Sequence, residues 1–232
     1  ERQRRPVADA GHELRPPLPS LRTNLELLMA SSRPGAPSLS EEDREEMLAD
    51  VQAQVTELSA LVGDLVELAR EDTPQAVHEP VDLVDVVERA LSRARRRAPR
   101  TEFDVRLAPW EMMGDATALE RAVLNLLDNA AKWSPEEGRV RVELLPDPAS
   151  GQVVLEVADS GPGIAPADRP YVFERFYRSS DARTLPGSGL GLSIVKQVAE
   201  RHGGSVWAGE APEGGALLRM SLPGGPPQTE QQ

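Results

Sequence analysis

The apolar residues at the start of the chain recur at helical spacing. Between about residues 7 and 32, leucines follow one another at intervals of three and four, which places them on one face of an amphipathic helix. The stretch "SSRPGAPS" then interrupts this pattern with the turn-forming residues proline and glycine. The leucines of this first stripe are Leu14, Leu18, Leu21, Leu25 and Leu28.

A second amphipathic helix is predicted to begin after Ser40. Serine is a favoured N-cap, and the acidic residues 41–43 follow it, where the helix dipole favours negative charge. The two helices predict a helical hairpin over residues 1–73. Because two helices cannot cover both of their own apolar stripes, we expect a homodimer that forms a four-helix bundle. The second stripe consists of Met47, Val51, Leu58, Leu61, Leu65 and Leu68.

Beyond a predicted linker at residues 74–80, helical and strand patterns alternate. The alternating apolar residues of "GRVRVELL" and "QVVLEVAD" are typical of half-buried strands. The order of elements predicts an α+β sandwich over residues 81–223, with helices on one face of a mixed sheet, and a disordered tail at 224–232. The fold class is therefore multidomain, an all-α helical hairpin followed by an α+β sandwich. The expected helices span residues 82–98, 115–133 and 189–202, and the expected strands span residues 102–107, 110–113, 138–145, 152–159, 205–209 and 216–222.

Composition excludes several kinds of site. The formal net charge of −12 argues against an extended surface for the phosphates of DNA or RNA, so we expect no nucleic-acid partner. The absence of cysteine rules out disulfides and thiolate metal sites, and the three histidines at 12, 78 and 202 form no obvious zinc cluster. The sequence contains no apolar run of about 18 residues, the length that a membrane-spanning helix requires, so we expect no membrane-spanning helix in this chain. Because the first residue is Glu, we expect this chain to be a portion of a longer protein.

The stretch "DSGPGIAP" combines a carboxylate with two glycines at the end of a predicted strand. Gly161 and Gly163 allow the backbone to approach a ligand closely. Asp159, as a strand-end acceptor, suits an exocyclic amine such as adenine N6. A plain turn after a strand is the alternative explanation of the same residues.

A second glycine-rich stretch, "GSGLGLSIV", opens a predicted helix. Glycines at a helix N-terminus present N–H groups and the positive end of the helix dipole to phosphates. The spacing matches neither the dinucleotide fingerprint nor the Walker pattern, and a flexible hinge is the alternative. The glycines are Gly187, Gly189 and Gly191.

The stretch "NLLDNAAKW" places two amide side chains on one face of a predicted helix. Asn125 and Asn129 are four residues apart, in a helix interior that disfavours asparagine. Amide oxygens suit Mg²⁺, which also takes phosphate and water ligands. Lys132 would then meet phosphates and Trp133 an adenine ring. A solvated amide pair beside a core tryptophan is the alternative.

Five motifs in this order resemble those of the sensor histidine kinases of two-component systems, over roughly residues 6–223. "HELRPPLPSL" is similar to the phosphoacceptor box, "NLLDNAAKW" to the N box, and "FERFYR" to the F box. "DSGPGIAP" and "GSGLGLSIV" are similar to the two glycine boxes. The resemblance implies a dimeric helical hairpin followed by a Bergerat-type ATP-binding sandwich, with ATP and Mg²⁺ as cofactors.

The resemblance also implies roles for single residues. His12 becomes the phosphoacceptor and Glu13 its acid–base partner. Asn129 becomes the principal Mg²⁺ ligand, supported by Asn125. The remaining implied roles are phosphate contact by Lys132, an aromatic near the base at Trp133, reading of adenine N6 by Asp159, and shaping of the nucleotide loops by Gly161, Gly163, Gly187, Gly189 and Gly191.

A mobile ATP lid is implied at residues 161–188, anchored by Phe173 and Phe176. Arg175 and Arg178 in that lid become candidates for the γ-phosphate. Their alternative explanation is a solvated helix face.

The phosphoacceptor box departs from the family pattern in ways that disfavour a helix. Gly11 replaces the usual serine, and Pro16 and Pro19 replace residues that are commonly polar. Each interior proline costs about 3 kcal/mol relative to alanine. A helix that restarts with Pro17 at its first position avoids part of this cost, because Pro19 then needs no intrahelical N–H bond.

Two hypotheses of function follow. The first is an ATP-dependent autokinase that phosphorylates His12 and passes the phosphoryl group to an aspartate of a response-regulator receiver domain. The second is an ATP-binding dimeric pseudokinase or scaffold with an impaired acceptor helix. In either case the resemblance implies the cytoplasmic portion of a membrane sensor, attached only through an upstream segment that this chain lacks.

Overall fold

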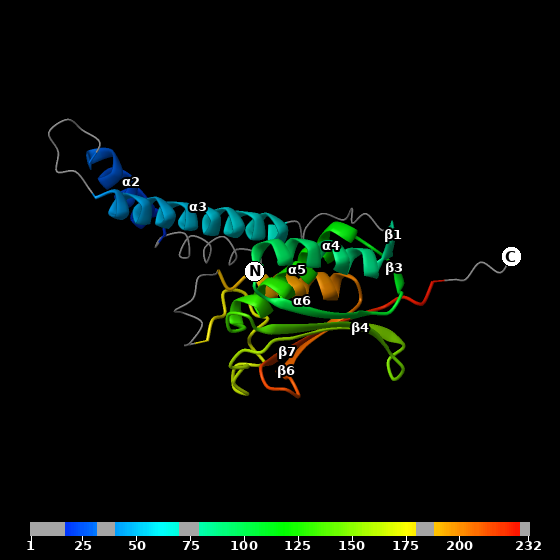
Figure 1. Ribbon diagram of the computed structural model, residues 1–232. Helices are drawn as coiled ribbons and strands as arrows, with labels where there is room; N and C mark the ends of the chain where they lie inside the picture. Colours follow the sequence, from blue (N-terminus) through cyan, green and yellow to red (C-terminus); the bar gives the residue numbers. More distant parts are fainter. Residues whose placement is uncertain (1–16, 32–39, 70–78, 180–187, 228–232) are drawn as a thin grey trace. The chain divides into compact units, whose positions relative to one another are not determined.

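The structure, a computed structural model, describes residues 17–31, 40–69, 79–179 and 188–227 (Figure 1). The chain divides into two compact units. The helical unit comprises residues 1–71 with 186–188, and the sheet unit comprises residues 72–185 and 189–232. His12, Glu13, Gly187 and the departures at Gly11 and Pro16 lie outside the described residues.

The helical unit contains two helices that pack against each other, α2 (Pro17–Ser31) and α3 (Glu41–Ala69). The predicted N-cap of the second helix is confirmed, since Ser40 Oγ accepts a hydrogen bond from the Asp43 N–H at 3.1 Å. The described part of the first helix begins at Pro17, where proline needs no intrahelical N–H bond. Several large apolar side chains of this unit are exposed, namely Leu25, Leu27, Met29, Leu48 and Val55.

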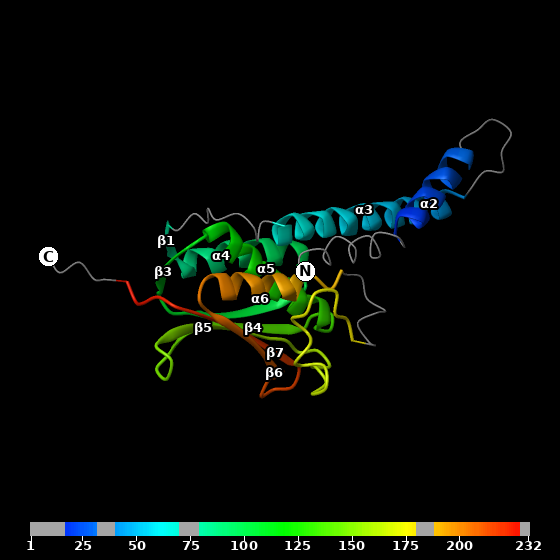
Figure 2. The ribbon, with the colours of Figure 1, turned by 180° about the vertical axis from the view of Figure 1, so that it is seen from behind.

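The sheet unit is built on a five-stranded mixed sheet with the order β2-β4-β5-β7-β6. β2 and β4 are parallel, and the other neighbouring strands are antiparallel. Helices α4, α5 and α6 cover one face of this sheet (Figures 1 and 2), which confirms the predicted α+β sandwich. The strands are β2 (Glu102–Leu107), β4 (Arg139–Asp147), β5 (Gln152–Ala158), β6 (Ser205–Glu210) and β7 (Ala216–Leu222).

A two-stranded ribbon accompanies the main sheet, and the sequence predicted only half of it. β3 (Glu111–Gly114) was expected, but its antiparallel partner β1 (Glu79–Asp82) begins within the predicted linker. With four residues, one proline and a single buried side chain, β1 offers no alternating pattern. The predicted tail also starts too early, because Gly225 exchanges two backbone hydrogen bonds with Glu111, at 2.8 and 3.0 Å.

The three helices of the sheet unit are α4 (Leu83–Arg97), α5 (Ala116–Trp133) and α6 (Gly191–Arg201). Aspartates cap the first two. Asp82 Oδ1 accepts from the Val84 N–H at 2.8 Å, and Asp115 Oδ1 accepts from the N–H groups of residues 117 and 118 at 3.0 Å. All three helices bury an apolar stripe. α5 contacts β4 and β5, and α6 contacts β6 and β7, while α4 packs against α5.

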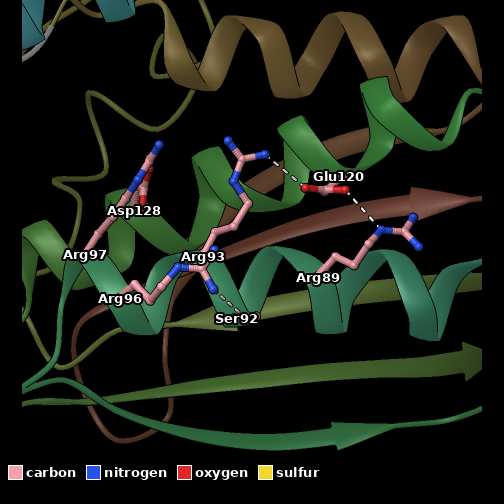
Figure 3. Close-up of polar contacts among 7 residues, drawn as sticks. All are labelled: Arg89, Ser92, Arg93, Arg96, Arg97, Glu120 and Asp128. Carbon is pink, nitrogen blue, oxygen red and sulfur yellow. Dashed lines mark hydrogen bonds and ion pairs between the residues drawn. The ribbon is translucent and has the colours of Figure 1, made fainter.

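Arginines along α4 reach carboxylates on α5 (Figure 3). Glu120 pairs with Arg89 at 3.1 Å and with Arg93 at 3.0 Å, and Asp128 pairs with Arg97. Burial raises the pKa of the Asp128 carboxyl, and Arg97 and Arg93 oppose that rise. Because the arginine side chains are about half exposed, these pairs add little stability beyond the apolar packing of the two helices.

Candidate nucleotide-binding site

A cavity of about 410 Å³ lies within the sheet unit. Its walls come from the last turns of α5, the end of β5, the segment that follows it, the start of α6 and the turn between β6 and β7. The size suits a drug-sized or nucleotide-sized ligand. Five of the residues predicted from the sequence to bind a nucleotide line it: Asn129, Trp133, Asp159, Gly163 and Arg178.

The carboxylate of Asp159 lies at the wall of the cavity, directly after β5, and only 5% of the residue is exposed. Its Oδ1 accepts hydrogen bonds from the N–H groups of Gly161 and Ala216, both at 2.9 Å. Among the described residues, none donates a hydrogen bond to Oδ2. Burial raises the pKa of this carboxyl, and the two N–H donors oppose the rise. The site therefore holds a fixed acceptor whose second oxygen is left for a ligand.

Glycines around Asp159 are required by close backbone contacts. A Cβ on Gly161 would lie 2.5 Å from the Trp133 carbonyl oxygen, so this turn can pack against the end of α5 only without a side chain. Gly215 has a φ of +88°, and a Cβ there would lie 2.0 Å from the Asp159 carbonyl oxygen. Gly215 also lines the cavity, and it was not predicted from the sequence. The pair of glycines directly before β7 was the available signal.

The two asparagines of α5 have different surroundings. Asn129 lines the cavity, together with Trp133 one turn further on. Asn125 instead donates from Nδ2 to the Gly191 carbonyl oxygen at 3.2 Å, so it ties α5 to the start of α6. Lys132 Nζ lies 5.6 Å from the centroid of the Trp133 ring, and Lys132 is not among the residues that line the cavity.

The segment after β5 closes one side of the cavity with Gly163 and Arg178. Gly163 has a φ of +79°. Tyr177 donates its hydroxyl to Asp168 Oδ1 at 2.6 Å, which folds the segment back on itself. Tyr177 and Asp168 also line the cavity, and neither was predicted from the sequence.

The two phenylalanines predicted to anchor the lid, Phe173 and Phe176, have different surroundings. Phe173 is buried, at 8% exposure. The Phe176 N–H donates to the Gly189 carbonyl oxygen at 3.1 Å, and a Cβ on Gly189 would lie 3.0 Å from Phe176 Cα. Gly189 therefore makes room for the end of this segment. Arg175, Gly161, Gly189 and Gly191 are not among the residues that line the cavity.

Two family models match the chain. The His Kinase A (phospho-acceptor) domain matches residues 2–74, and the Histidine kinase-, DNA gyrase B-, and HSP90-like ATPase matches residues 114–226. The second match includes every residue that lines the cavity. This chain belongs to the sensor histidine kinases. This membership confirms the resemblance indicated by the five motifs, and the cavity lies within the ATPase-type domain.

Individual histidine kinases support the same conclusion. A signal transduction histidine-protein kinase/phosphatase MprB of Mycobacterium avium is 58% identical over 97% of this chain and 44% of its own length. The solved mycobacterial sensor histidine kinase MprB is 51% identical, with a TM-score of 0.60, over 64% of this chain and 100% of that one. Full-length ShkA, solved in complex with AMPPNP, is 26% identical, with a TM-score of 0.65, over 96% of this chain and 46% of its own.

The chain spans less than half the length of the curated relatives it matches. None of the helices in the described part of the chain combines the length and the apolar character that a membrane crossing requires.

Proposed function

We propose that this chain is an ATP-dependent protein-histidine autokinase, which phosphorylates His12 and passes the phosphoryl group to an aspartate of a response regulator. The observation that carries the proposal is the buried carboxylate of Asp159 at the cavity wall, with one oxygen satisfied by backbone N–H groups and the other left for a ligand. Such an acceptor suits the exocyclic amine of adenine.

The residues present fit ATP and Mg²⁺. Gly215 and Gly161 keep the backbone close around the base acceptor, and Trp133 offers an aromatic face at the same wall. At the cavity, Asn129 offers the amide oxygen that Mg²⁺ accepts as a ligand, and Arg178 offers positive charge for the phosphates. Bound Mg²⁺ would offset the negative charge of the transferring phosphoryl group. Asn125 supports Asn129 from the same helix, and Lys132 contacts the phosphates.

The transfer itself needs a nucleophile and a base. The imidazole of His12 is a competent nucleophile when neutral, since its unperturbed pKa is about 6.5. A nitrogen of the ring attacks the γ-phosphorus of ATP, the bond to the β–γ bridging oxygen breaks, and ADP leaves. Glu13 orients the ring and accepts its proton. Arg178, and Arg175 on the same segment, offset charge on the phosphoryl group as it transfers.

Dimerisation and localisation belong to the same proposal. The exposed apolar side chains of α2 and α3 and the match to a phospho-acceptor domain support a homodimer through residues 7–72. Relatives that extend well beyond this chain support a sensor protein in which this part is cytoplasmic. The pseudokinase alternative has no support from the relatives, which are named as kinases.

Incubation with γ-labelled ATP and Mg²⁺ tests the proposal. We expect label on the protein that is lost in acid and kept in base, as expected for a phosphohistidine. His12→Gln should abolish the label while ATP binding persists, and Asn129→Ala should abolish it by weakening nucleotide binding. His78→Gln is the matched control and should label like the parent chain. Absence of acid-labile label in the parent, or equal labelling of His12→Gln, would refute the autokinase assignment.

A further inference from the structure

The ring of His202 is buried where α6 ends, with 6% of the residue exposed. Its Nδ1 lies 2.7 Å from the Val198 carbonyl oxygen, within α6. Its Nε2 lies 3.0 Å from the backbone N–H of Asp115, the residue that caps α5. A carbonyl only accepts and an N–H only donates, so Nδ1 carries the proton and Nε2 is the acceptor. The neutral ring in this tautomer joins two helices.

The neighbouring strand leaves space for this ring. Gly114 ends β3 directly before Asp115, and a Cβ on Gly114 would lie 2.8 Å from Cδ2 and 2.9 Å from Nε2 of His202. Gly114 lacks the positive φ that would by itself require glycine. The glycine is therefore explained by the approach of the imidazole.

A second hydrogen bond also joins α6 to α5. At the other end, the Asn125 side chain donates to the Gly191 carbonyl oxygen at 3.2 Å. The two contacts are ten residues apart on α5 and eleven apart on α6, so the helices run antiparallel and are tied near both ends. Asn129 lies one turn beyond Asn125 and Leu192 directly follows Gly191, and both line the cavity.

We propose that His202 is a positioning residue for nucleotide binding, which acts as a hydrogen-bond acceptor that fixes the helix carrying Asn129 against the helix that follows the second glycine box. The inference rests on the proposed ATP site. It differs from an ordinary core histidine, whose loss lowers stability but leaves the cavity unchanged. If the Asp115 N–H loses its acceptor, the first turn of α5 must shift to reach water, and the nucleotide must then restore the original spacing of the helices.

Three substitutions separate the acceptor from the bulk of the ring. Glutamine carries its amide oxygen near the position of Nε2 and can still accept from Asp115. Asparagine reaches only the position of Nδ1, and leucine has no polar atom. We expect His202→Gln to bind the Mg²⁺ complex of AMPPNP within about threefold of the parent chain. His202→Asn and His202→Leu should bind about tenfold more weakly, as expected for a part-buried donor that loses its acceptor.

Equal affinity in all three variants and the parent would overturn the proposal, and so would a glutamine variant as weak as the leucine variant. If the leucine variant does not fold, Gly114→Ala decides, because its Cβ displaces the ring without removing a polar group. It should weaken AMPPNP binding. Gly225→Ala is the matched control, since a Cβ there meets nothing within 4 Å. Unchanged binding by Gly114→Ala would count against the proposal.

A second readout does not depend on nucleotide. The chain has no cysteine, so spin labels can be placed selectively at Thr117→Cys on α5 and Glu200→Cys on α6. Both positions are exposed. The label distance should be narrowly distributed in the parent and in His202→Gln, and broader or shifted in His202→Leu. An unchanged distribution in His202→Leu would overturn the proposal. A parent chain that fails to bind AMPPNP would refute the proposed function, while the label distances would still decide the role of His202.

Discussion

Replacing Asp159 by asparagine should separate the binding of adenine from the stability of the fold. The asparagine side chain would retain an oxygen at the position of Oδ1, where Gly161 and Ala216 donate at 2.9 Å. At the position of Oδ2 it would place an NH₂ group, which donates where the adenine amine also donates. The substitution therefore keeps the internal hydrogen bonds and removes only the acceptor at Oδ2, to which no described residue donates.

The expected loss follows from the kind of hydrogen bond removed. A hydrogen bond to a charged group contributes about 1.5–3 kcal/mol, which corresponds to a roughly 10- to 150-fold weaker affinity. We expect Asp159→Asn to lose at least that much affinity for ATP, measured by calorimetry. ITP, which carries a carbonyl in place of the amine, should bind poorly to the parent chain and comparatively better to Asp159→Asn. Equal ATP affinity in the two proteins would refute the assignment of Asp159.

Stability should change in the opposite sense. Because burial raises the pKa of Asp159, the folded chain holds this proton more tightly than the unfolded chain does. Ionisation of Asp159 therefore opposes folding. The protonated carboxyl favours the folded chain, and this contribution to stability is lost as the pH rises through the raised pKa. At pH 7 we expect Asp159→Asn to unfold at the same temperature as the parent or higher. A clear drop in unfolding temperature would show that the charge itself stabilises the turn.

Affinity has its own pH dependence. ATP needs the ionised carboxylate, so its affinity for the parent chain should fall as the pH is lowered through the raised pKa of Asp159. Protonation of ATP itself affects both proteins alike. Only the difference between the parent and Asp159→Asn reports the titration of this residue.

Three further outcomes are expected. Asn129→Ala should leave the unfolding temperature unchanged and weaken ATP binding more with Mg²⁺ than with EDTA; equal losses in both conditions would argue against a metal ligand. Leu25→Asp should split the homodimer in sedimentation experiments, because it buries a charge in the expected bundle, whereas Thr23→Asp, on the other side of the helix, should not. Pro16→Thr should raise both phosphotransfer and dephosphorylation of the response regulator, the second more, because proline offers no group to orient water; equal phosphatase rates before and after the change would contradict this reasoning.

Much of the fold was predictable because its elements carry strong periodicity. α5 and α6 begin and end within a few residues of their predicted bounds, and β4 and β5 show the expected alternation. β1 was missed because a short edge strand with one buried residue has no period to detect. Its existence depends on pairing with β3, which is a long-range property.

The site was predictable where residue type and position in a motif suffice. Asn129, Trp133 and Asp159, which the motifs predict as nucleotide or metal contacts, all line one cavity. Gly215 could not be found in this way, because it is needed only where the turn before β7 passes the Asp159 backbone. The different surroundings of Asn125 and Asn129 could not be predicted either. Helical spacing alone puts both amides on one face of the helix, and it does not show that α6 lies against Asn125.

The ribbon beside the main sheet brings the first and last described segments of the sheet unit together on one strand. β1, with which the described part of this unit starts, pairs with β3, and Gly225, near its end, bridges the first residue of β3. Domains whose ends adjoin tolerate circular permutation. A short linker could therefore join the two ends, with new termini opened in the exposed turn at residues 148–151 between β4 and β5. Such a rearranged ATP-binding unit would keep its cavity intact, and it could be inserted as a cassette into a loop of another protein.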